Sequence, residues 1–197
     1  MEKNSKYFRE LGWKQLQDRW SEPVIYSLVY LIITGVVSGS FSVLALLLLP
    51  MGYSYSVAFL NDIRNGKEPF KVETLFDGYK DFMRIFGTTL LMNVYIFLWT
   101  LLLIVPGIIK SISYSQTYYV LKDNPELKFN EAIERSMEMM EGHKMQYFLL
   151  MLSFIGWIIL IILTCGILSL WVTPYMNATF ANYYEYVKEE YEKRITA

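Results

Sequence analysis

Histidine and cysteine are nearly absent from this chain, which holds one of each, His143 and Cys165, in 197 residues. A single cysteine excludes an internal disulfide. A single histidine excludes metal sites built on a histidine pair, such as the zinc-binding His-Glu-x-x-His pattern. The sequence also lacks the Gly-x-Ser-x-Gly elbow of hydrolases and a phosphate-binding Gly-Lys-Ser/Thr loop. We therefore predict that the protein is not an enzyme and binds neither a cofactor nor a metal.

Charge is also scarce, at 19% of residues against about 25% in a typical soluble protein. The net charge of −1 gives no basic face for nucleic acid. Residues 24–60, 85–121 and 145–184 contain no acidic or basic side chain except Lys110. A bilayer core about 30 Å thick is crossed by about 20 apolar residues, so each stretch fits two crossings. The pattern predicts an all-α, polytopic membrane bundle of about six transmembrane helices arranged as three hairpins.

The basic residues predict the orientation. All of them except Lys110 lie before, between or after the charge-free stretches. The turns expected inside the stretches are uncharged: Ser38-Gly39-Ser40, a region from Trp99 to Gly107, and Thr164-Cys165-Gly166. By the positive-inside rule both termini are cytoplasmic, and little of the chain protrudes on the other side.

A threefold repeat is suggested by the starts of the stretches, at Val24, Ile85 and Met145. Each start follows an amphipathic helical pattern that either lies on the inner leaflet or covers the floor of the bundle. We predict one membrane domain over residues 1–197, with repeat units 5–61, 70–122 and 129–187 and a short cytoplasmic tail, 188–197. Three unrelated hairpins remain the alternative.

Two short motifs accompany the repeat. Two amphipathic segments end alike, in Gly78-Tyr79-Lys80 and Gly142-His143-Lys144; by its distance from the span, Asp18-Arg19-Trp20 matches them better than Gly12-Trp13-Lys14. Each second span also carries a proline, namely Pro50, Pro106 and Pro174, which predicts a kink. Pro106-Gly107 fits either a kink or a helix start.

Lys110 is the one ionisable residue inside a predicted span, and such a residue is a candidate functional site. It begins a polar run that includes Tyr114 and Gln116, which Asn93 and Asn177 in other spans could face. One interpretation is a polar cavity in which Lys110 holds an anionic headgroup or solute. The other is a lysine that extends to the outer interface.

Several motifs of the central and C-terminal regions resemble one known family. They are Phe97-Leu98-Trp99, Ile104-Val105-Pro106-Gly107-Ile108-Ile109-Lys110, Asp123-Asn124-Pro125-Glu126, Glu131-Ala132-Ile133, Gly142-His143-Lys144, Leu152 to Trp157, and Thr173-Pro174-Tyr175. Together they resemble the bacterial integral-membrane family called domain of unknown function 975, well over residues 70–187 and loosely before them. A looser similarity links them to the membrane domain of some glycerophosphodiester phosphodiesterases. The resemblance implies a multi-pass protein of the bacterial cytoplasmic membrane and no established activity.

Two functions are compatible with these features. The first is a non-enzymatic membrane adaptor or scaffold that contacts membrane lipids or other membrane proteins through its cytoplasmic face. The second is a small transporter or permeability factor with a polar cavity near Lys110. The sequence indicates neither a partner protein nor an oligomeric state.

Overall fold

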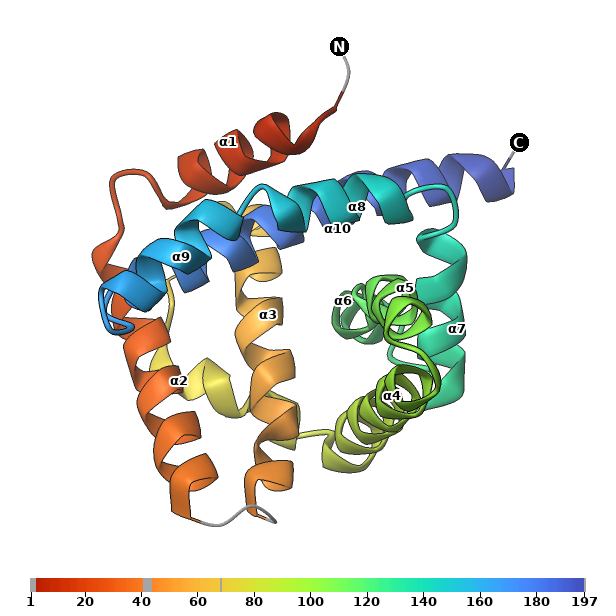
Figure 1. Ribbon diagram of the computed structural model, residues 1–197, viewed down its shortest axis with the longest axis horizontal. Coiled ribbons are helices and arrows are strands. Elements are labelled where there is room, and N and C mark those ends of the chain that lie inside the picture. The colour runs from red at the N-terminus through yellow and green to blue at the C-terminus, as the bar shows by residue number, and fades with distance from the viewer. Residues whose placement is uncertain (1–2, 41–43, 68, 197) are drawn as a thin grey trace.

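The charge-free stretches fold into helices. The computed structural model describes residues 3–40, 44–67 and 69–196, with the backbone alone for residues 37–40, 44 and 45, and no strand occurs among these residues. In chain order the elements are α1 (Ser5–Leu16), α2 (Ser21–Ser40), the 3₁₀ helix η1 (Leu44–Leu48), α3 (Leu49–Arg64), the 3₁₀ helix η2 (Val72–Tyr79), α4 (Phe82–Leu102), α5 (Ile104–Tyr114), α6 (Thr117–Asp123), α7 (Asn130–Met139), α8 (Lys144–Leu152), α9 (Ile155–Leu163) and α10 (Ser169–Thr196) (Figure 1). The predicted all-α class is confirmed.

Two helical segments are long and apolar enough to cross a membrane: α4, and Lys144–Leu163, which comprises α8 and α9. The helix over Ser21–Val36 is apolar but shorter. The structure therefore supports membrane crossing at two places and does not confirm six spans. The second span predicted for the middle hairpin is interrupted at Ser115-Gln116, which leaves α5 and α6 too short to cross, and α3 has only 16 residues.

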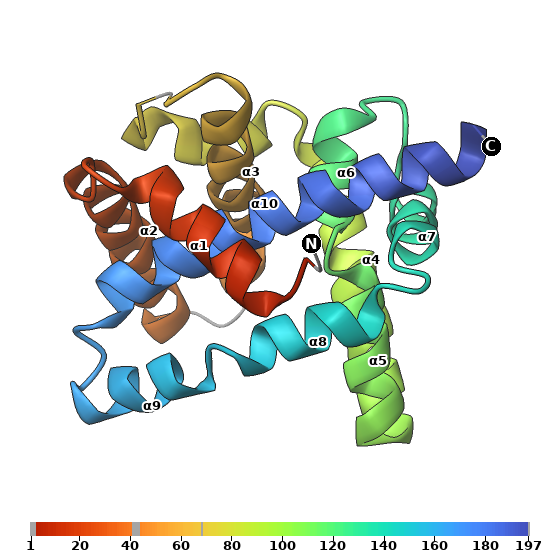
Figure 2. The ribbon, with the colours of Figure 1, turned by 90° about the horizontal axis from the view of Figure 1, so that it is seen from above.

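The three hairpins point in different directions. In Figure 1, α2 and α3 run vertically, whereas α8, α9 and α10 run across the picture; Figure 2 shows α4 and α5 leaving the rest of the fold in a third direction. The helix α10 crosses α3 and contacts it extensively. The hairpins therefore meet around α10 and α3 and diverge from there, rather than lying side by side.

The amphipathic segments pack in a recurring pattern. The segment η2 packs chiefly on α3, α7 packs chiefly on α6, and α1 packs chiefly on α10 (Figure 2). Each segment thus covers the second half of another hairpin, and α1 joins the start of the chain to its end. This is the packing that a threefold repeat would give.

Glycine lets two of these segments approach closely. A Cβ atom at Gly12 would lie 2.8 Å from the backbone nitrogen of Thr179 on α10, and one at Gly78 would lie 2.3 Å from the carbonyl oxygen of Pro50 on α3. Both distances exclude a side chain without movement of the backbone. Gly12 and Gly78 thus share a close approach to a long helix, which favours Gly12-Trp13-Lys14 as the counterpart of Gly78-Tyr79-Lys80; the correspondence with Asp18-Arg19-Trp20 stays a prediction. Gly142 differs, because it has a φ of +83° and no close neighbour.

The three prolines do not act alike. Pro50 lies at the start of α3, where its missing N–H costs little, so the predicted kink is absent. Pro106 lies in the first turn of α5, and Gly107 packs against Thr100 of α4, which makes this region a turn between helices. Pro174 alone lies inside a helix, α10.

The predicted turns are placed with mixed success. The chain reverses between α9 and α10 around Thr164-Cys165-Gly166, as predicted, with positive φ at Cys165 and Gly166. The turn predicted at Ser38-Gly39-Ser40 was placed too early, because α2 continues through Ser40. Up to residue 196 the predicted tail is the continuation of α10.

Replacement of Gly12 by alanine tests the packing of α1 on α10. We expect Gly12→Ala to lower stability by about 1–3 kcal/mol, because the added methyl group overfills a backbone contact. Gly35→Ala is the matched control, since nothing lies within 4 Å of a Cβ there; it should be neutral or stabilising. Thermal unfolding in detergent measures both variants, and equal effects would contradict the close contact.

Candidate functional site

A cavity of about 240 Å³ lies where the three hairpins meet. Every hairpin contributes to its lining, which consists of Ser56, Met92, Ile96, Ser111, Tyr114, Ser115, Tyr118, Tyr119, Tyr147, Asn177 and Phe180. None of these side chains is charged. The surface therefore combines aromatic faces with a small number of hydroxyl and amide groups, which is the usual composition of a small-molecule site.

A helix break borders this cavity. The helix α5 ends at Tyr114 and α6 begins at Thr117, so the backbone at Ser115 and Gln116 leaves the helical path. Ser136 of α7 stabilises the break, since its Oγ donates to Ser113 O (2.8 Å) and accepts from Gln116 N (3.2 Å). Broken helices recur at binding sites inside membrane proteins, because their ends present backbone polar groups to a cavity.

The structure brings together part of the predicted site. Tyr114 and Asn177 line the cavity. Gln116 is buried in the helix break and its Nε2 donates to the cavity residue Ser115 (2.7 Å), while its Oε1 is buried without a donor among the described residues. Asn93 donates to Thr89 O one turn earlier on α4 and does not line the cavity.

Lys110 lies outside the cavity lining. Its Nζ is 5.2 Å from the centre of the Trp99 ring, 5.9 Å from the centre of the Tyr114 ring and 3.7 Å from Met137 Sδ. The charge is thus placed behind Tyr114 by cation–π contacts rather than presented to a solute.

Two tyrosines connect the cavity lining to a cluster of charges. Tyr119 of the lining stacks on Tyr184 of α10, with ring centres 5.0 Å apart. The Tyr184 hydroxyl donates to Asp123 Oδ2 (2.7 Å), at the end of α6. Asp123 also accepts from Arg64 of α3 (Nη2, 2.8 Å) and from Lys188 of α10 (2.8 Å). We call Arg64, Asp123, Tyr184, Glu185 and Lys188 the ionic hub; its fifth member, Glu185, accepts from Arg64 Nε (2.5 Å).

A second carboxylate, Asp62, occupies the corresponding place on α3. It accepts from Gln15 Nε2 (2.8 Å) and Arg19 Nη2 (2.7 Å), and Asn182 of α10 donates to Gln15 Oε1 (2.8 Å). Asp62 thereby links α1 and the start of α2 to α3 and α10. Its side chain is 1% exposed and does not border the cavity.

The two carboxyl groups titrate in opposite directions, and both lie outside the charge-free stretches. Burial raises the pKa of Asp62, and the contacts with Gln15 and Arg19 only partly offset it. Burial acts in the same direction on Asp123, but hydrogen bonds from Arg64, Lys188 and Tyr184 together hold the pKa of that carboxyl well below its usual range. Asp123 is therefore the better stabilised anion.

The hub was not predicted from the sequence, although the repeat carries a signal for it. Asp62, Asp123 and Tyr184 are spaced by 61 residues, the same distance that separates Val24 from Ile85. Corresponding residues of the three units would meet if the units surrounded one axis. Tyr118 and Tyr119 belong to the polar run that follows Lys110, whereas Tyr147 was missed as a cavity residue. No group of three or more histidine, cysteine or acidic residues suited to a metal occurs among the described residues.

Residues 100–191 match the family model described as Protein of unknown function (DUF975). The match supports the resemblance over the C-terminal half of the chain. It includes α5 to α9 and most of α10, and therefore most of the residues that line the cavity. No curated protein and no solved structure matches the chain.

Substitution of Asp62 and Asp123 by asparagine tests the opposite pKa shifts of these two carboxyl groups. We expect Asp123→Asn to lower stability by about 2–3 kcal/mol at neutral pH, because Arg64 and Lys188 lose a shared, largely buried counterion. Since the pKa of Asp123 is lowered on folding, this difference should shrink as the pH falls below the ordinary value of 3.8.

Asp62→Asn should behave in the opposite way. A raised pKa means that the stabilising contribution of Asp62 is full below the ordinary pKa and is lost as the pH rises through the folded pKa. The difference between wild type and Asp62→Asn should therefore grow in acid. Unfolding curves at several pH values between 7 and 3 measure how the stability difference between wild type and each variant changes with pH. If both differences change in the same direction, the opposite pKa shifts of Asp62 and Asp123 are contradicted.

Proposed function

We propose that the chain is a multi-pass membrane protein that binds and passes a small, uncharged polar solute through the cavity between its hairpins. The observation that carries the proposal is an uncharged, hydroxyl-bearing cavity that borders the helix break at Ser115-Gln116 and draws on all three hairpins. The hub closes one end of this cavity, and the hairpins diverge away from it.

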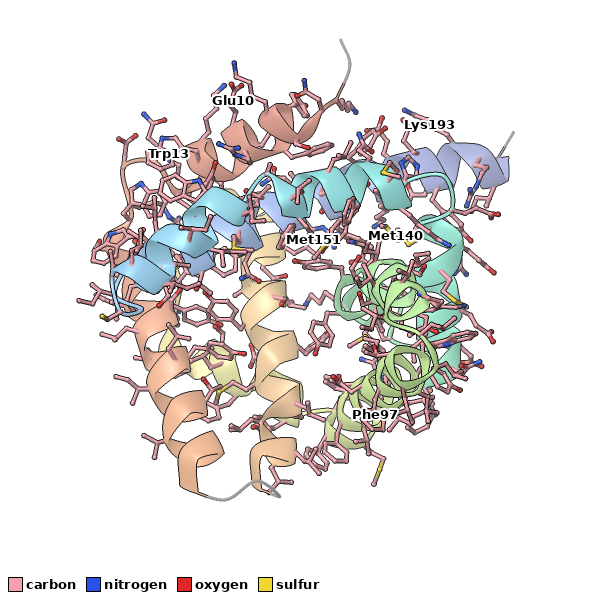
Figure 3. The ribbon with its side chains drawn as sticks, viewed as in Figure 1. Glu10, Trp13, Phe97, Met140, Met151 and Lys193 are labelled. Carbon is pink, nitrogen blue, oxygen red and sulfur yellow. The ribbon has the colours of Figure 1, made fainter. Side chains whose placement is uncertain are left out.

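The distribution of polar and apolar side chains supports a membrane setting. None of the residues of α9 is buried, although the helix consists almost entirely of isoleucine and leucine with one tryptophan. Such a helix is unfavourable in water and favourable in lipid. Figure 3 shows Glu10 and Lys193 at one edge of the molecule and Phe97 toward the opposite side. We place the charged edge and both termini in the cytoplasm, with the six predicted spans as three hairpins that enter a bacterial cytoplasmic membrane and diverge.

The lining restricts the chemistry of the solute. An anion would find no cation in the lining, and an organic cation would find no carboxylate. Aromatic faces attract cations, but the charge of Lys110 behind Tyr114 opposes this attraction. Tyrosine hydroxyls and the Asn177 amide favour a neutral molecule with hydrogen-bonding groups, such as a polyol or an amide.

The adaptor function remains the second candidate. Phe76 of η2 and Met83 of α4 are exposed and would be available to another membrane protein. Met139 and Met140, at the end of α7, are buried and would not be available to a partner. Phe76→Asp tests this candidate, because it should abolish an adaptor function while leaving solute permeation intact.

Permeation through proteoliposomes tests the solute proposal. Vesicles that contain the protein should take up glycerol or urea faster than empty vesicles, as measured by stopped-flow light scattering, and should exclude choline and glutamate. Asn177→Leu should lower the added permeability roughly fivefold, because one hydrogen bond contributes about 1 kcal/mol.

Asn93→Leu is the matched control. Like Asn177, Asn93 donates to the carbonyl oxygen four residues earlier, but it is exposed and does not line the cavity. Its substitution should leave the permeability unchanged. Equal losses in the two variants, or no permeation by the wild type, would contradict the proposal.

Cysteine labelling tests the direction in which the cavity opens. In a Cys165→Ser background, Ser115→Cys should react in intact cells with a membrane-impermeant thiol reagent, because the hub closes the cytoplasmic end. Leu150→Cys, fully buried and outside the lining, should not react. Labelling of Ser115→Cys from the cytoplasmic side alone would reverse the proposed orientation.

A further inference from the structure

Four of the five tryptophans gather around one apolar groove. Trp13, Trp20, Trp157 and Trp171 line it together with Leu168, Val172 and Tyr175, and its volume is about 610 Å³. The ring of Trp13 lies 5.1 Å from that of Trp20 and 5.7 Å from that of Tyr175, whereas the Trp157 ring lies 6.3 Å from Tyr175. The groove thus runs along the junction of the first and third hairpins, separate from the solute cavity.

A positive charge lies beside the groove, at Arg9, which contacts the lining residue Tyr175. Arg9 and Trp13 are four residues apart on α1 and therefore share a helix face, which both use to contact Tyr175. Arg9 Nε donates to the Tyr175 hydroxyl (3.5 Å) and Nη1 donates to Ser153 O (3.3 Å) at the break between α8 and α9. Figure 3 shows the neighbouring Glu10 pointing outward, and its partner is Lys6, at 3.9 Å.

Arg9 has no carboxylate partner among the described residues. Its partners are neutral, namely Tyr175, Ser153 O and the Phe154 ring at 5.8 Å, so its charge stays uncompensated and attracts an anion. Guanidinium groups bind phosphate through paired, charge-assisted hydrogen bonds. The groove itself offers no carboxylate that would hold the ammonium group of a zwitterionic lipid.

We propose that this groove binds one phospholipid with an anionic headgroup, with an acyl chain along the four tryptophans and the phosphate at Arg9. The inference rests on the membrane setting of the proposed function and is independent of solute permeation. The lipid would fill the space between α1 and the α9–α10 turn and so bind the first and third hairpins to one another. Tryptophan is suited to this place because it is favoured where acyl chains meet headgroups.

Quenching of tryptophan fluorescence by brominated lipids tests the groove directly. In a Trp99→Phe background all remaining tryptophans line the groove. The protein is reconstituted in phosphatidylcholine that contains a small, equal fraction of either brominated phosphatidylglycerol or brominated phosphatidylcholine. We expect the phosphatidylglycerol to quench roughly twofold more strongly, since an anionic lipid should concentrate at the groove.

Three variants decide whether Arg9 causes the preference. Arg9→Gln should abolish it, and Arg9→Lys should retain most of it, which separates loss of charge from loss of folding. Lys6→Gln removes a nearby surface charge and should leave the preference intact. Equal quenching by the two lipids in the wild type, or an equal loss in Lys6→Gln, overturns the lipid site while the membrane setting stands. If even fully brominated phosphatidylcholine does not quench the tryptophans, protein covers the groove and the lipid site is overturned. Solute permeation measured in the same vesicles then shows separately whether the proposed function survives.

Discussion

The carboxylate of Asp123 is the contact on which the arrangement of the hairpins depends. It lies at the end of α6 and binds one cation from the end of α3 and another from within α10, so a single charge joins three helices. Because its side chain is 9% exposed, the anion needs these partners, and the partners need the anion. The convergence of the hairpins at one side, and their divergence at the other, follows from this requirement.

The hub and the cavity together form a closed floor beneath an aromatic chamber. Tyr119 faces the cavity, Tyr184 lies behind it, and Asp123 holds the hydroxyl of Tyr184. Arg64 and Lys188 are each about 30% exposed, so water can solvate them in part when their ion pairs with Asp123 are broken.

Charge pattern and periodicity predicted the helices well, because the membrane-like absence of charge and the placement of glycine and proline are local features. The cavity was predicted only in part. Tyr114 and Asn177 line it, but Lys110 does not, since the rotation of α5 depends on its contacts with Trp99 and Met137. The start of α3 at Pro50 was mistaken for a kink, because a proline in an apolar run looks alike in both settings.

The three predicted repeat units are similar in how they pack but differ in the charge at corresponding positions. This difference decides which helices each acidic residue joins. The corresponding positions hold Asp62, Asp123 and Tyr184. Asp62 binds Gln15 and Arg19, which precede α2, whereas Asp123 binds Arg64 at the end of α3 and Lys188 of α10. Tyr184 supplies a donor in place of a third acid, which avoids repulsion between like charges at the centre. The contacts of α6 with α3 and α10 therefore depend on Asp123, whereas α1, α3 and α10 are also joined through Asp62 and Gln15.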